Sequence, residues 1–245
     1  VNGGNVDSGN FAQTYGGAVT AGGAASSTTS FTGKGITFGQ TLDASSRLKV
    51  NDSGATVYAG AIGSVTAPAH FETDALGSST FSGGMVRTSS PNSIYIADDA
   101  VVTAANTTFD TTNNGALATG ANITFAKTLN GIAHNTQSVV LNAGTGGTVL
   151  VTGAIGNTQA LKTLTLANSN GATFSAAVTT GTEVVLSNTT AGQTIRFAHD
   201  LSTAALTTTG NAYHLALVGD NTHISGATTF LNTGNLTLGD AANDN

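Results

Sequence analysis

The 245-residue sequence predicts an all-β protein built as a parallel β-solenoid, a chain wound into stacked coils of about 20 residues. Short runs of β-branched or aromatic residues alternate with polar residues, and Gly or Asn separates one run from the next. On a strand, alternation with period two turns one side chain inward and the next outward. Helical periodicity is nearly missing, and the abundant Gly, Thr, Asn and Ser all disfavour helices.

The alternating runs continue along most of the chain. Clear examples are Ile36–Phe38, Ile94–Ile96, Leu164–Leu166, Val184–Leu186, Thr194–Phe197 and Leu236–Leu238. In the second half the runs centre near residues 139, 149, 164, 174, 185, 195, 206, 216, 224 and 237. A spacing of about ten residues holds a strand and a turn and leaves no room for a helix.

A longer period is also present. Ile36-Thr37-Phe38 returns as Ile123-Thr124-Phe125, 87 residues later, and Gly60–Gly63 returns as Gly153–Gly156, 93 residues later. Thr80-Phe81-Ser82 likewise returns as Thr173-Phe174-Ser175. We therefore expect one continuous solenoid, 1–245, made of units of about 90 residues. The predicted units are a partial copy 1–34, two full copies 35–121 and 122–210, and a partial copy 211–245.

An alternative architecture is a series of immunoglobulin-like β-sandwiches of about 90 residues, whose antiparallel strands recur every 8–12 residues. Such domains usually contain a Trp or a comparable large aromatic core, and this sequence has no Trp. The abundance of small residues suits tight coil corners better. The solenoid is the favoured prediction.

Composition excludes several function classes. Charged residues make up 8% of the chain and the formal net charge is −6, so no basic footprint for nucleic acid is present. No apolar run approaches the roughly 18–20 residues of a membrane-spanning helix. The absence of Cys excludes disulfides, thiol nucleophiles and thiolate metal sites.

Few acidic groups are placed to do chemistry. Asp98-Asp99 is an adjacent carboxylate pair, but neighbours on a strand point to opposite faces, so we expect a solvated turn after Ile96. The oxygen-rich tail, residues 239–245, could coordinate Ca²⁺, which takes six to eight oxygen ligands. The tail lacks the spacing of known calcium loops, and a frayed end is the expectation. Ca²⁺ therefore stays a weak alternative to having no cofactor.

Histidines give equally weak signals. The five are His70, His134, His199, His214 and His223. His214 and His223 could meet on adjacent strands, but two His without a third ligand make a poor zinc site. His199-Asp200 lies near Arg196 in the sequence, and we expect a polar strand end there. No catalytic residue is predicted.

The wording of the second half resembles a known family. The segments "ANITFAKTLNG" and "TTGNAYHLALVGDNTHISGATTFLNTGNLTLGD", within Ala121–Thr180 and Thr208–Asp240, resemble repeats of filamentous-haemagglutinin-type and autotransporter-like adhesins. "FAQTYGGAVT", Phe11–Thr20, is similar in character. The resemblance implies a right-handed parallel β-helix, export from a bacterium, and a stalk or adhesive role without catalytic residues.

The expected function is therefore a non-enzymatic structural or adhesive segment of a secreted bacterial surface protein, located outside the cell or on its surface. An alternative is a self-assembling filament or surface-layer subunit joined end to end through its strand edges. A less favoured third is a carbohydrate-active β-helix enzyme. The expected partners are further copies of the chain, or glycans or proteins on a host or neighbouring cell.

Overall fold

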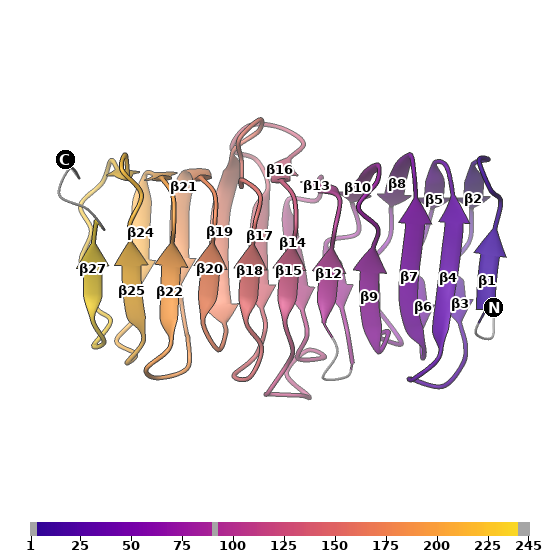
Figure 1. Ribbon diagram of the computed structural model, residues 1–245, viewed down its shortest axis with the longest axis horizontal. Helices are drawn as coiled ribbons and strands as arrows, with labels where there is room; N and C mark the ends of the chain where they lie inside the picture. Colours follow the sequence, from indigo (N-terminus) through magenta and orange to yellow (C-terminus); the bar gives the residue numbers. More distant parts are fainter. Residues whose placement is uncertain (1–3, 90–92, 240–245) are drawn as a thin grey trace.

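The computed structural model describes residues 4–89 and 93–239, and over these residues the chain is all-β with no helix. The strands form a parallel β-solenoid of about 10 turns of roughly 23 residues, slightly longer than the expected coil. Figure 1 shows an elongated molecule with the two ends of the chain at opposite ends of the stack. The alternative of tandem sandwiches is wrong, because every pairing among the described strands is parallel.

One sheet runs the full length of the molecule and is called the first sheet below. Its order is β1-β4-β7-β9-β12-β15-β18-β20-β22-β25-β27, one strand from each turn (Figure 1). The strands are β1 (Gly4–Asp7), β4 (Thr28–Gly33), β7 (Arg47–Asp52), β9 (His70–Thr73), β12 (Ile94–Ile96), β15 (Ile123–Phe125), β18 (Val149–Val151), β20 (Ala172–Phe174), β22 (Thr194–Phe197), β25 (His214–Leu217) and β27 (Leu236–Leu238).

The second sheet begins with β2 (Gln13–Tyr15), β5 (Ile36–Phe38), β8 (Ala55–Tyr58), β10 (Ser78–Phe81), β13 (Asp99–Val102) and β16 (Leu129–Gly131). A bridge residue, Ile155, joins β16 to the start of β21 (Val178–Leu186), which pairs with β23 (Leu201–Thr203). β23 in turn pairs with β26 (His223–Ile224). The sheet thus continues along the stack.

The third sheet begins with β3 (Val19–Ala21) and β6 (Leu42–Ala44), and bridges through Ile62 connect it to β11 (Met85–Arg87). It continues through β14 (Asn106–Asp110), β17 (Ser138–Asn142), β19 (Leu161–Asn168) and the end of β21, which pairs with β24 (Ala205–Thr208). The nine residues of β21 therefore serve two sheets.

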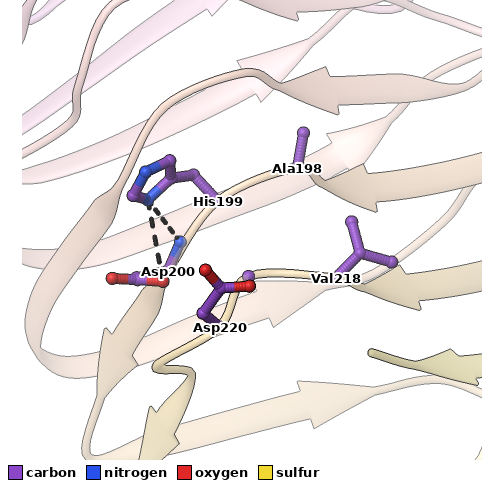
Figure 2. A pocket seen from close by; sticks show the side chains of 6 residues that line it. Ala198, His199, Asp200, Val218 and Asp220 are labelled. Atoms are coloured by element: carbon purple, nitrogen blue, oxygen red, sulfur yellow. Dashed lines mark hydrogen bonds and ion pairs between the residues drawn. The ribbon is translucent and has the colours of Figure 1, made fainter. Parts of the chain in front are cut away.

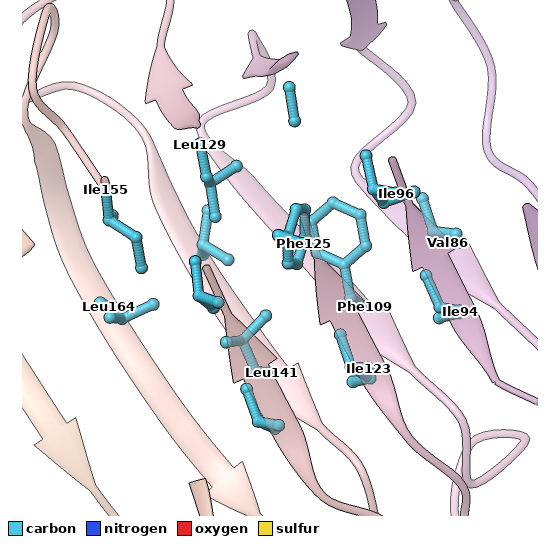
Figure 3. Close-up of a cluster of buried hydrophobic side chains, with 14 of the residues drawn as sticks. Val86, Ile94, Ile96, Phe109, Ile123, Phe125, Leu129, Leu141, Ile155 and Leu164 are labelled. Carbon is cyan, nitrogen blue, oxygen red and sulfur yellow. The ribbon is translucent and has the colours of Figure 1, made fainter. Parts of the chain in front are cut away.

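Inward side chains of the three sheets form one apolar column along the axis. In the first sheet the register stacks these residues in two rows, one of which runs Phe71, Ile94, Ile123, Val149, Ala172, Ile195 and Leu215. Figure 3 shows Ile94 and Ile123 from this row meeting Phe109 and Leu141 of the third sheet. These side chains are fully buried. Burial of apolar surface on every turn is the main stabilising term of such a stack.

Aromatic rings fill the column near the start of the chain. Tyr15, Phe38, Tyr58 and Phe81 occupy the same row of the second sheet, and successive ring centroids lie 5.2, 5.5 and 5.1 Å apart in stacked geometry. Phe71 meets Tyr58 edge-on at 5.6 Å. Aromatic pairs of this kind contribute about 0.5–1.5 kcal/mol each beyond their buried area.

A ladder of asparagine amides follows one corner of the second half. Asn142 pairs with Asn168, Asn188 Nδ2 donates to Asn168 Oδ1 at 3.2 Å, and Asn211 Nδ2 donates to Asn188 Oδ1 at 3.0 Å. Each turn therefore supplies a partner to the next at the position where the strand ladder is interrupted. The ladder satisfies polar groups that the corners would otherwise leave unpaired.

The repeated sequence segments form similar corners on different sides of the solenoid. Asp43 Oδ1 accepts hydrogen bonds from Val65 N and Thr66 N, and Asn130 Oδ1 accepts from Thr158 N and Gln159 N. The first corner lies on the third sheet, after β6, and the second lies on the second sheet, after β16. The matches therefore reflect a recurring corner, while the structural repeat is the single turn. The division into 90-residue units stays a prediction.

Candidate functional site

Asp98 lies inside the solenoid, so the expected solvated turn is wrong for this residue. Its side chain is 3% exposed, and it accepts hydrogen bonds from Thr73 Oγ1 and Ser79 Oγ, both at 2.7 Å. Burial raises the pKa of the Asp98 carboxyl to about 6, although the two hydroxyl donors act in the opposite direction. The hydroxyl of Tyr58 is also buried here, and burial with the nearby Asp98 charge raises its pKa well above the usual value.

Asp99 points away from Asp98, as period-two alternation predicts. Its carboxylate accepts from Thr128 Oγ1 at 2.6 Å and from Thr128 N at 3.2 Å on the next turn. The two aspartates therefore do not share a proton or a ligand. Of the acidic tail, only Gly239 belongs to the described part of the chain, and residues 240–245 lie outside it.

The other histidine candidates do not come together. His214 begins β25 in the first sheet, and His223 begins β26 in the second. His214 Nδ1 accepts a hydrogen bond from Asn235 N at 2.8 Å, and His134 is exposed. No group of three potential His, Asp or Glu metal ligands occurs within residues 4–89 and 93–239.

His199 and Asp200 line a small polar hollow between two corners, as Figure 2 shows. The hollow has a volume of about 120 Å³, and Asp220 lies on its other wall. His199 Nδ1 is 3.6 Å from Asp200 Oδ1, and Asp200 Oδ1 accepts from Asn221 N at 3.0 Å. The His199 side chain is largely exposed. This agrees with the expected polar strand end.

A denser polar cluster lies on the outward face of the first sheet. Three successive strands place Arg47, His70 and Ser93 in one row and Lys49, Glu72 and Tyr95 in the next. Lys49 Nζ is 2.8 Å from Glu72 Oε1, and Glu72 Oε2 is 3.3 Å from His70 Nε2. We call these six residues the charged patch.

Burial and pairing perturb the titratable groups of the charged patch. Burial lowers the pKa of His70 below its usual value, and this effect outweighs the hydrogen bond with Glu72, which acts to raise it. Burial acts to raise the pKa of Glu72, but hydrogen bonds from Lys49 and His70 outweigh it, so the pKa of Glu72 is lowered. His70 is therefore a neutral base beside an ionised carboxylate at neutral pH.

A neutral hollow lies further along the same face. Its floor includes Leu150, which is 38% exposed, and the missing side chain of Gly171 leaves it open. Amides and hydroxyls surround this floor, and the lining is Thr148, Val149, Leu150, Asn170, Gly171, Ala172, Thr173, Gln193 and Thr194. No ionisable side chain is among these lining residues. The surface is suited to an uncharged ligand rich in hydroxyl or amide groups.

Sequence reasoning named His70 but missed the charged patch around it. The spacing contained the signal, since Arg47, His70 and Ser93 are 23 residues apart, as are Lys49, Glu72 and Tyr95. With a known turn of 23 residues, residues at this spacing would have been expected to stack on one face. The expected 20-residue coil hid the relation.

Comparisons with protein families, with curated proteins and with solved structures find no match to this chain. The described residues contain no helix long and apolar enough to cross a membrane. Function is therefore argued from the surfaces and the core alone.

Proposed function

We propose that this chain is a structural and adhesive segment of a secreted bacterial surface protein, acting by shape and contact rather than by turnover. The observation that carries this proposal is the uninterrupted first sheet, which contributes one strand to each of about 10 turns. A stack of ten steps of about 4.8 Å makes a rod about 48 Å long. Such a rod holds a contact surface at a fixed distance from its base.

The exterior supports a role in variable surroundings. Thr, Ser and Asn supply most of its polar groups, and only 8% of the residues are charged. Salt screens interactions between exposed charges but leaves apolar burial and backbone ladders largely intact. We therefore expect the rod to keep its shape over a wide range of ionic strength.

The contact surface in this proposal is the outward face of the first sheet from Tyr95 to the neutral hollow at Leu150. Tyr95 is 37% exposed and Leu150 is 38% exposed, and Thr124 lies between them in the same outward row. An aromatic ring, an apolar floor and surrounding amides suit a neutral glycan or a polar protein segment. The partner class is thus a glycan or protein on another cell.

The test is binding of the purified chain to cultured host cells and to a panel of immobilised neutral glycans. We expect Tyr95→Ala and Leu150→Arg to lose at least about tenfold in affinity, which is about 1.4 kcal/mol. Thr165→Arg, on the outward face of the third sheet, is the matched control and should bind like the wild type. Equal binding by all four proteins would rule out this face as the contact surface. Antibody labelling of intact producing cells tests the surface location.

A second candidate function is a subunit of an end-to-end assembly. Leu236 and Leu238 continue the inward rows of the first sheet, yet they are 39% and 64% exposed at the last described strand. At the opposite end Val6 lies in the inward row that Leu238 continues. Growth of fibres by the purified chain, abolished by Leu238→Asp, would favour this candidate. Monomers at high concentration would count against it.

A further inference from the structure

Three side chains of the charged patch form a hydrogen-bonded chain that the structural role does not use. Ser93 Oγ lies 3.3 Å from His70 Nδ1, and His70 Nε2 lies 3.3 Å from Glu72 Oε2. His70 and Glu72 are two residues apart on β9 and therefore share a face, and Ser93 precedes β12 on the adjacent turn. A hydroxyl, an imidazole and a carboxylate in this order form a nucleophile, a base and an orienting group.

Glu72 determines which nitrogen of His70 carries the proton. A carboxylate only accepts hydrogen bonds, and Lys49 Nζ already donates to Glu72 Oε1 at 2.8 Å. Oε2 is left for His70 Nε2, which must be protonated to donate. The Nδ1 atom of the neutral ring then keeps its lone pair and accepts the hydrogen bond from the Ser93 hydroxyl. This is the arrangement in which the ring can take the serine proton.

Burial separates the roles of these groups. His70 is 7% exposed, held between Glu72 on its own strand and Ser93 on the next turn. Ser93 is only partly buried, so its hydroxyl is open to a molecule that approaches the sheet. Tyr95 follows two residues later on the same face and provides an aromatic surface beside the hydroxyl.

We propose that Ser93 is an activated nucleophile that carboxylic esters acylate, with His70 as its general base and Glu72 as the residue that positions the imidazole. Ser93 Oγ bonds to the ester carbonyl carbon while its proton passes to His70 Nδ1. The adduct then breaks its bond to the alkoxy oxygen, which takes the proton from Nδ1 and leaves as the alcohol. Water attacks the resulting acyl-serine with His70 again as base, which releases the carboxylic acid and restores the serine.

Esters fit this site better than amides, because an alkoxy group leaves more readily than an amide nitrogen. The inference goes beyond the structural role and does not depend on it. A chain that binds no cell could still carry a reactive serine, and an adhesive chain could carry an inert one. The two proposals therefore fail separately.

The test uses the whole chain and a fluorophosphonate probe. Attack by Ser93 Oγ on phosphorus displaces fluoride and leaves the phosphonate on the serine, while the proton passes to His70. Mass spectrometry of peptides should locate the label at Ser93, and p-nitrophenyl acetate should acetylate the same residue. We expect Ser93→Ala to lose the label and His70→Gln to slow labelling by at least about 100-fold.

Matched variants separate reactivity from folding. Ser30→Ala removes a serine from the outward face two strands before β9 and should be labelled like the wild type. Glu72→Gln should slow labelling, and Glu72→Asp should restore part of the rate, because only a carboxylate holds the Nε2 proton. Circular dichroism confirms that each variant is folded. Absence of label at Ser93 in the folded wild type, or equal rates in wild type and folded His70→Gln, would overturn the proposal.

Discussion

The buried carboxylate of Asp98 lowers stability at neutral pH, and replacing it by a neutral isostere should recover that loss. Its pKa rises from the ordinary 3.8 to about 6 because the side chain is 3% exposed among apolar and hydroxyl groups. A rise of about two pKa units corresponds to about 3 kcal/mol. Asn keeps the shape and one oxygen acceptor, and its amide can donate to the Ser79 hydroxyl. We expect Asp98→Asn to be up to about 3 kcal/mol more stable at pH 7.5.

The sign follows from the protons bound in each state. Between pH 4 and 6 the folded chain holds the Asp98 proton more tightly than the unfolded chain does, so stability falls as pH rises through this window. Below pH 4 both states are protonated and the difference between wild type and variant should vanish. Asp74, whose pKa burial also raises, is present in both proteins, so the comparison isolates Asp98.

The assay is urea denaturation followed by far-UV circular dichroism at pH 4 and pH 7.5. Asp220→Asn, at an exposed position, is the control and should change stability by no more than about 0.5 kcal/mol at pH 7.5. The reasoning is refuted if Asp98→Asn is less stable than the wild type at pH 7.5. It is refuted equally if the gain is the same at both pH values.

Three further substitutions probe other parts of the stack by the same denaturation assay. Asp52→Ala should cost about 3 kcal/mol, because Gly35 N, Gly54 N and two further donors lose their acceptor; hydrogen bonds outweigh burial in lowering the pKa of Asp52, so its contribution should fade in strong acid. Tyr58→Phe should be neutral or stabilising by up to about 1 kcal/mol, because it keeps the ring stack and removes a buried hydroxyl without a hydrogen-bond partner, whereas Tyr58→Ala should cost about 4 kcal/mol. Asn188→Ala should cost about 1–2 kcal/mol, since it leaves Asn168 and Asn211 without their ladder partner; no loss would show that water replaces the amide.

Period-two patterning identified most of the strands without the structure. All ten run centres predicted in the second half fall within strands, from β17 near 139 to β27 near 237. These runs are visible because each strand has one face in a dry core and the other in water. The three-residue β23 and the bridge at Ile155 were missed, because three or fewer residues give too little alternation to detect.

Asp98 shows where local interpretation was incomplete. Counting by twos from Ile96 through Asp98 to Ala100 places all three side chains inward, and all three are buried. Polarity suggested a solvated turn instead. The carboxylate tolerates the interior because Thr73 and Ser79, from different parts of the preceding turn, donate to it. Those donors are not visible in the sequence around residue 98.

Residue patterning was sufficient to predict an all-β chain, the absence of helices and the inward or outward direction of most strand residues, because these depend on neighbours along the chain. The joining of distant segments depended on turn length, which varies from 19 residues between Thr29 and Leu48 to 29 between Ile94 and Ile123. A parallel ladder accepts any corner length that returns the strand in register. The charged patch around His70 therefore became visible only when three strands were stacked.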